Sequence, residues 1–235
     1  MKSERRSIWL RVLAEGVAIV ASILLAFGIQ AWWEGRRDRV EERAALEGLR
    51  QEFAGNLDQL NAGASSYEKS LRMTRRLLAL SRADSLAPNP LAMDSLIRIG
   101  WLDYGTFNPG QGVLTALVTS GDIGLIRDAR LREAIGAWSG MLDDLVEEEL
   151  MMARDSQERW APALQARIQL SFVHAVNEEQ VSEGPRPDYR KILGDQLLEN
   201  YLWERIDNTR YVLADYARLH ALVEEIIELS DGSLR

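Results

Sequence analysis

Two histidines and the acidic residues near them have the clearest potential for chemistry in this chain. His220 is followed one helical turn later by Glu224, a spacing that can place two metal ligands on one helix face. A di-metal centre in a helical bundle needs about four carboxylates and paired Glu-x-x-His motifs on two helices. The only other histidine is His174, and no glutamate lies three residues before either histidine. The sequence therefore predicts no metal site and places His220 at the edge of a bundle.

Two further segments are rich in groups that bind ions. The acidic run 143–149, DDLVEEE, offers carboxylates to a hard cation, but a rigid helix does not wrap an ion as a loop does. The glycine-rich segment 105–112 precedes a predicted helix N-terminus, where anions can bind, yet it lacks the lysine of a P-loop and follows no strand. We expect a solvated helix face and a tight connection between helices. With no cysteine and no nucleophile-elbow motif, the chain is predicted to have no catalytic residue and no cofactor.

The charge of the chain is unevenly distributed. Its formal net charge of -8 divides into about +2 for residues 1–50 and about -10 for the rest. An acidic domain binds nucleic acid poorly, because phosphate contacts require clustered cations. With 46% hydrophobic and 27% charged residues, the composition also excludes a disordered polymer and a protein of many membrane spans. We therefore expect no nucleic-acid partner.

An apolar segment near the N-terminus predicts a membrane anchor. Residues 16–33 contain no charge, and residues 12–33 as a helix would extend about 33 Å, enough to cross a hydrocarbon core of ~30 Å. Tryptophan favours the lipid–water interface, and an arginine at a helix end can extend to the headgroups. A cleaved signal peptide is the alternative, but the apolar region is long and no A-x-A site follows it. The candidate anchor and interface residues are Trp9, Arg11, Glu15, Trp32 and Trp33.

Two sets of residues are candidate partner contacts. Ala18, Ser22 and Ala26 form a small-xxx-small pattern that lets a neighbouring membrane helix approach closely. Trp203 and Tyr211 fall at helical spacing and belong either to the core or to a protein interface. The charge of Glu15 has two interpretations as well. It either pairs with a cation one turn earlier on the same helix or marks a functional position inside the membrane.

The remaining sequence predicts helices and no strands. Apolar residues recur at steps of mostly three and four from Val40 to Leu78, and ion pairs such as Arg37–Glu41 support a stalk helix. Prolines interrupt the pattern at later positions, and Asp128 is a predicted N-cap for a helix that runs to about residue 170. Further helices are expected over 91–102, 112–119 and, as a pair divided at 194–195, over 188–229.

The predicted fold class is therefore all-α, with an antiparallel helical bundle on a stalk. A short N-terminal flank, 1–11, precedes the transmembrane helix, 12–33. The helix continues into the stalk, 34–82, on which the bundle domain, 83–235, packs.

Two blocks of the sequence resemble a widespread group of bacterial single-pass membrane proteins of unknown function. The first block comprises Glu15, Leu24, Ala26, Ile29, Trp32 and Glu34, continued by Glu42, Arg43, Leu46, Leu49, Glu52 and Phe53. The second comprises Leu117, Ser120, Gly121, Ile126, Arg127, Asp128, Leu131 and Arg132, similar to the group's L-x-x-S-G-x-x-x-x-I-x-[DN]-x-x-L-R. The two blocks touch roughly 80 residues, and Gly28 and Ala31 stand where the group commonly has polar residues. The resemblance implies a topology and a helical domain, and it carries no activity.

Three functions are compatible with this pattern. We expect a non-enzymatic accessory subunit, a scaffold or stabilising protein of a larger membrane complex that could be respiratory or photosynthetic. A membrane-anchored sensor with a ligand- or partner-binding helical domain is the alternative, and a membrane-bound metal- or lipid-handling enzyme is the third. The expected partners are membrane lipid and other membrane-protein subunits, in a hetero-complex or a homo-oligomer.

We expect the protein in the inner (cytoplasmic) membrane, with a cytoplasmic N-terminus and a periplasmic domain. Lysine and arginine are nearly balanced on the two flanks of the apolar segment, four before it and five after it. The orientation therefore rests on the short N-terminal flank, since long domains are translocated largely regardless of charge.

Overall fold

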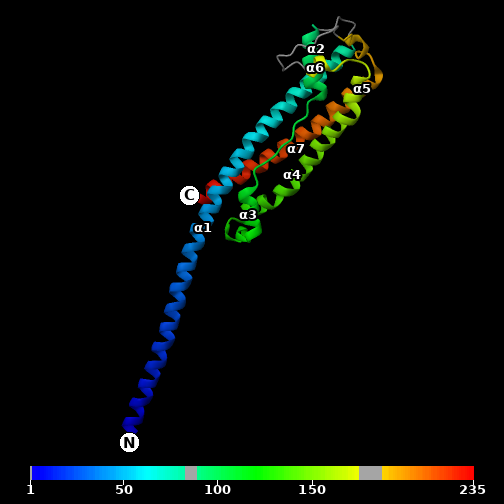
Figure 1. Cartoon of the computed structure of the whole chain (residues 1–235). Helices are drawn as coiled ribbons and strands as arrows, with labels where there is room; N and C mark the ends of the chain where they lie inside the picture. The colour runs from blue at the N-terminus through cyan, green and yellow to red at the C-terminus, as the bar shows by residue number, and fades with distance from the viewer. Residues whose placement is uncertain (1, 83–88, 175–186) are drawn as a thin grey trace.

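The computed structural model describes residues 2–82, 89–174 and 187–235, with side chains described from Glu15 onward except at residues 17 and 18. These residues form an all-α fold without strands. Helix α1 (Lys2–Ser81) rises from the N-terminus into a bundle with α4 (Ala129–Asp155) and α7 (Gln196–Leu234), as Figure 1 shows. The all-α prediction is confirmed.

Helix α1 is a single helix of 80 residues, about 120 Å long at 1.5 Å per residue. No proline occurs within it, and ion pairs at i,i+4 spacing support its exposed surface. The Arg37–Glu41 pair is 3.3 Å long and the Arg43–Glu47 pair is 3.2 Å long. The predicted continuity of the stalk with the segment before it is confirmed. In Figure 1 the N-terminal part of α1 projects from the bundle, and Leu46 is the first buried residue among its described side chains.

The bundle buries one continuous apolar core between α1, α4 and α7. Each helix contributes apolar side chains at steps of three and four, which form a stripe facing the other two. Phe53 and Trp138 meet edge-to-face, with ring centroids 4.9 Å apart. Fully buried core residues include Leu49, Phe53 and Leu60 of α1, Leu131, Trp138 and Leu145 of α4, and Leu198, Val212 and Ile226 of α7.

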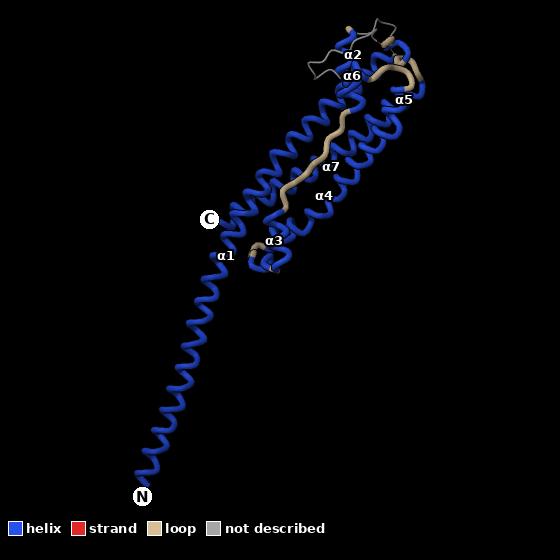
Figure 2. Tube along the Cα trace, in the orientation of Figure 1, coloured by secondary structure: helices blue, strands red, loops and turns tan. Residues whose placement is uncertain are grey.

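The helix directions differ in part from the expected antiparallel bundle. Helix α7 runs antiparallel to α1 and α4, but α1 and α4 run in the same direction (Figures 1 and 2). They can do so because an extended segment, residues 103–111, returns along the length of the bundle, as Figure 2 shows. The expectation of a tight connection at 105–112 is therefore wrong. The N–H and C=O groups of such an extended segment form hydrogen bonds with side chains of the neighbouring helices. Hydrophobic periodicity in the sequence does not predict these bonds.

Short helical elements close the two ends of the bundle. Far from the N-terminus lie α2 (Pro90–Ile97), α5 (Ala161–Gln165) and α6 (Ser171–His174), and toward the projecting end lies α3 (Gly112–Ser120), as Figure 1 shows. The described residues also form four single turns: η1 (Arg98–Leu102) and η3 (Ser156–Trp160), which are π-helical, and η2 (Asp122–Leu125) and η5 (Tyr189–Lys191), which are 3-10 turns.

Two sequence expectations about helix ends have clear outcomes. Asp128 caps α4 as predicted, and its carboxylate accepts bonds from the backbone N–H groups of Arg130 and Leu131. The predicted division of 188–229 at Gly194 and Asp195 is confirmed, but the first member of the pair is shorter than expected. The pair is one 3-10 turn followed by the single helix α7, which begins after Gly194 at a positive φ of 93° and the cap Asp195.

Among the residues whose side chains are described, no helix is both long and apolar enough to cross a membrane. Residues 12–14, 17 and 18 of the expected span lie outside the described side chains.

The close approach of η1 to α1 at Gly100 generates a stability prediction. A Cβ added at Gly100 would lie 2.8 Å from backbone atoms of Met73 and Thr74, so Gly100→Ala should lower the free energy of unfolding by about 1–3 kcal/mol. Gly136, inside α4, has nothing within 4 Å of an added Cβ, so Gly136→Ala should raise stability by about 0.5–1 kcal/mol. Urea titrations followed by circular dichroism measure both. Equal effects of the two substitutions would contradict the close approach.

Candidate functional site

The projecting segment, residues 15–44 of α1, is the first candidate site. Large apolar side chains are exposed all around it: Ile19, Val20, Ile23, Leu24, Leu25, Phe27, Ile29, Trp32, Trp33 and Val40. Trp32 and Trp33 are 63% and 65% exposed, and their ring centroids lie 6.2 Å apart. A contiguous exposed apolar surface of this size marks an interaction with a partner or a membrane.

The other predicted anchor and contact residues fall into two groups. Glu15, Ser22 and Ala26 lie on exposed positions of the projecting segment. The side chains of Trp9, Arg11 and Ala18 lie outside the described residues, so the expected pairing of Glu15 with Arg11 does too.

Trp203 and Tyr211 lie on α7, in the bundle, and the structure does not bring them together with the projecting segment. Trp203 is 40% exposed, and the guanidinium of Arg82 lies 5.4 Å from its ring centroid. Tyr211 is 63% exposed. Tyr211 therefore remains the more accessible of the two as a contact residue.

The second candidate site is a polar seam on α1, defined as Glu52, Asn56, Tyr67, Ser70 and Thr74. These residues share one face of the helix and bind the backbone of residues 99–114, far along the chain. Asn56 is bonded twice to Gly110: its side chain donates to the carbonyl at 2.9 Å and accepts from the N–H at 2.8 Å. The carboxylate of Glu52 caps α3 by accepting from the N–H groups of Val113 and Leu114, at 2.7 and 3.0 Å.

At the middle of the seam, a buried carboxylate holds the same extended segment. Glu149 accepts a 2.7 Å bond from the N–H of Phe107 and a 2.8 Å bond from the hydroxyl of Tyr216. Burial raises the pKa of Glu149 above its ordinary value, although both hydrogen bonds act in the opposite direction. The expectation of a solvated face is therefore wrong for Glu149, while Asp143, Asp144 and Glu147 are exposed as expected. Hydrophobic periodicity places Glu149 on the inner face with Leu142 and Leu145, and that signal could have located it.

A buried arginine holds the start of the extended segment. Arg205 donates to Ser70 Oγ at 2.9 Å and to the carbonyl of Asp103, and its guanidinium lies 5.3 Å from the ring centroid of Trp160. Burial lowers the pKa of Arg205 to about 10, so the side chain still carries its charge at neutral pH. The nearby cavity, lined by Tyr67, Ser70 and Asp103, is only about 80 Å³. Glu149 and Arg205 thus both bind the backbone of the extended segment.

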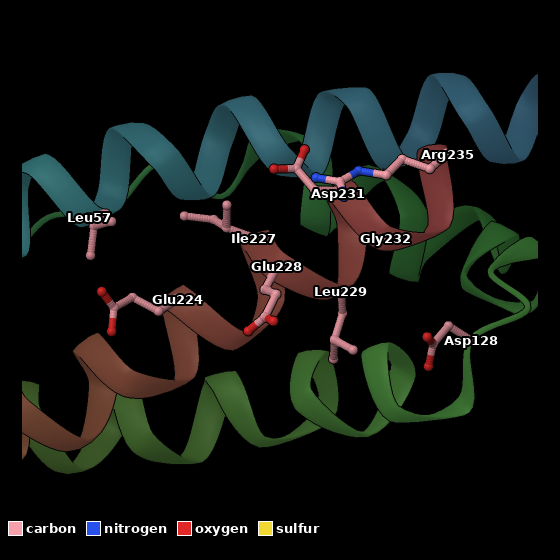
Figure 3. Close-up of a pocket in the computed structure, with 9 residues that line it drawn as sticks. All are labelled: Leu57, Asp128, Glu224, Ile227, Glu228, Leu229, Asp231, Gly232 and Arg235. Carbon is pink, nitrogen blue, oxygen red and sulfur yellow. The ribbon is translucent and has the colours of Figure 1, made fainter.

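An acidic groove lies where the C-terminal end of α7 meets α1, with a volume of about 620 Å³ (Figure 3). The labelled carboxylates do not converge on one point, and three already have partners. Asp128 caps α4, Asp231 lies 3.5 Å from Arg50, and Glu224 lies 3.3 Å from His220. Among the described residues, no group of three or more histidine, cysteine, aspartate or glutamate side chains could hold a metal ion.

The two histidines lie apart from any such group. His220 sits at the edge of the bundle, with its ring nitrogens 3.1 Å from Asn61 Oδ1 and 3.3 Å from Glu224. His174 ends α6, and its carbonyl accepts a bond from Arg98.

Comparisons of the chain with protein-family models, with curated proteins and with solved structures found no match.

The raised pKa of Glu149 predicts a pH dependence of stability. Between its ordinary value of 4.5 and the raised folded-state value, the folded chain keeps a proton that the unfolded chain has lost. The contribution of Glu149 to the free energy of unfolding should therefore be largest below pH 4.5 and fall as the pH rises through the raised pKa. Glu149→Gln should remove this fall while keeping an oxygen to accept from Phe107.

The measurement is the difference in unfolding free energy between wild type and variant from pH 4.5 to 8. Glu147→Gln, which changes an exposed carboxylate on the same helix, is the control. A constant difference between wild type and Glu149→Gln across this range would contradict the prediction.

Proposed function

We propose that the chain is a non-enzymatic, single-pass membrane protein, whose helical bundle is a scaffold or stabilising subunit of a larger membrane complex. The projecting segment of α1 is the observation that carries this proposal. Its apolar side chains are exposed on all sides, as in a helix surrounded by lipid, and its ion pair with the bundle is made near its end, by Glu42. Trp32 and Trp33 close its uncharged part, at the place where indole rings favour the interface.

The continuity of α1 supports a structural role for the bundle. One helix joins the proposed anchor to the core without a flexible linker, so the membrane and the bundle keep a constant separation and orientation. The buried polar groups of the bundle bind its own backbone, and its surface groove is open with divergent carboxylates. These features favour a subunit that positions itself or a partner over one that turns over a substrate. An energy-transducing complex, respiratory or photosynthetic, is the kind of assembly that we propose.

The proposed role predicts a stoichiometric protein partner. Native mass spectrometry of the complex, purified gently through a tag on the full chain, should show this protein bound to other membrane subunits. Tyr211→Ala, on the exposed side of α7, should reduce the bound partner several-fold, because interface aromatics contribute most of the binding energy. Leu150→Ala removes an exposed apolar side chain from α4 and is the matched control. Recovery of the chain alone, without a partner, would contradict the accessory role.

The proposed location is the inner membrane, with the N-terminus in the cytoplasm and the bundle in the periplasm. Protease added to intact spheroplasts should then digest the bundle, and a cytoplasmic marker protein should survive. Cleavage only after the membrane is opened would reverse the orientation. Recovery of the full chain in the supernatant of an alkaline carbonate wash would contradict the anchor itself.

A further inference from the structure

The first turns of α1 after the tryptophans carry arginines on one face. At about 100° per residue, Arg36, Arg39 and Arg43 fall within an arc of about 60° that also contains Trp32. Glu34 and Glu41 lie roughly on the opposite side of the helix. Trp32 and the three arginines line a surface groove of about 570 Å³ together with Val40, Ala44 and Glu47. The arginine face therefore carries one carboxylate, Glu47, which pairs with Arg43, while Arg36 and Arg39 stand nearer Trp32.

Two of these arginines have no ion-pair partner among the described side chains. Arg43 is paired with Glu47 at 3.2 Å, and Arg37, on another face, is paired with Glu41 at 3.3 Å. Arg36 and Arg39 are exposed and form no such pair with any described residue. Their uncompensated charge disfavours a second copy of this chain on the same face, because like charges would meet across the interface.

The same face continues into the apolar part of the helix. Leu25 and Ile29, both exposed, lie within about 60° of Trp32, so apolar side chains, an indole ring and two arginines follow one another along one line. Arg36 lies about 6 Å and Arg39 about 10 Å beyond Trp32 along the axis. The polar layer of a bilayer is about 5–8 Å deep on each side, and arginine side chains extend toward it. This order of groups matches that of a phospholipid with an acidic headgroup.

We propose that this face of α1 binds an anionic phospholipid, with its phosphate at Arg36 and Arg39 and an acyl chain along Leu25 and Ile29. The inference rests on the proposed membrane anchor and adds a lipid preference to it. Binding at this point fixes the depth of α1 in the leaflet on the side of the bundle.

The test uses the full chain, reconstituted into bilayers of phosphatidylcholine and phosphatidylglycerol at a fixed ratio. The protein is then extracted gently, and mass spectrometry measures the lipids that remain bound. Wild type should retain phosphatidylglycerol enriched at least about twofold over the bulk ratio, and Arg36→Gln/Arg39→Gln should return the ratio to that of the bulk. Arg37→Gln is the matched control, because Arg37 occupies the same depth but is paired with Glu41, and it should keep the enrichment. Inorganic phosphate at millimolar concentration should not displace the lipid, since the site includes the apolar stripe.

The outcomes separate the lipid site from the anchor on which it rests. Stable insertion with equal lipid ratios for wild type and the double variant would overturn the lipid site and leave the anchor intact. Failure of the wild type to insert into either lipid would overturn both. Displacement by phosphate alone, or an oligomer that dissociates in the double variant, would also overturn the lipid site, because the arginines would then serve a free anion or a protein.

Discussion

The extended backbone of residues 103–111, which is bonded to all three long helices, is the constraint on which the rest of the bundle depends. An extended segment has no internal hydrogen-bond ladder, so each buried N–H and C=O needs a partner from elsewhere. Each of the three long helices supplies some of these partners: the polar seam of α1, Glu149 of α4 and Arg205 of α7. Because all three helices bind the same segment, their relative register is specified by hydrogen bonds as well as by apolar packing.

This arrangement explains why charged groups are buried inside the bundle. A buried charge is costly unless hydrogen bonds compensate for its lost hydration. Glu149 accepts bonds from an N–H and a hydroxyl. Arg205 donates to a hydroxyl and a carbonyl, and its guanidinium lies over an aromatic ring. Tyr67 and Tyr216 remain protonated beside Glu149, because burial and the carboxylate raise the pKa of both phenols. In this cluster, the hydroxyls of Tyr67 and Tyr216 and the guanidinium of Arg205 are hydrogen-bond donors. Their acceptors include backbone carbonyls and the carboxylate of Glu149.

The sequence predicted the parts of the fold that depend on local pattern. The continuous helix α1 and the cap Asp128 follow from helical periodicity, the absence of proline and the chemistry of N-caps. The extended segment was missed because its stabilising bonds join residues 38 and 54 positions apart, as in Tyr67–Gly105 and Asn56–Gly110. In the sequence, Asn56 only interrupts an apolar stripe, and nothing nearby indicates which backbone it binds. Helical periodicity predicts that one face of a helix is buried, but it does not predict which segment of the chain packs on that face.

The distribution of charge fits the proposed membrane arrangement. Residues 51–235 carry about -10, so an anionic bilayer surface would repel the bundle, whereas Arg36 and Arg39 would be attracted to it. The first ion pair between α1 and the bundle, Glu42–Arg127 at 3.3 Å, lies nine residues beyond Trp33, or about 14 Å along the axis. That distance exceeds the Debye length of about 8 Å at physiological ionic strength, so the surface repels the bundle only weakly. A straight helix of this length therefore lets basic residues contact the headgroups while an acidic domain stays clear of them.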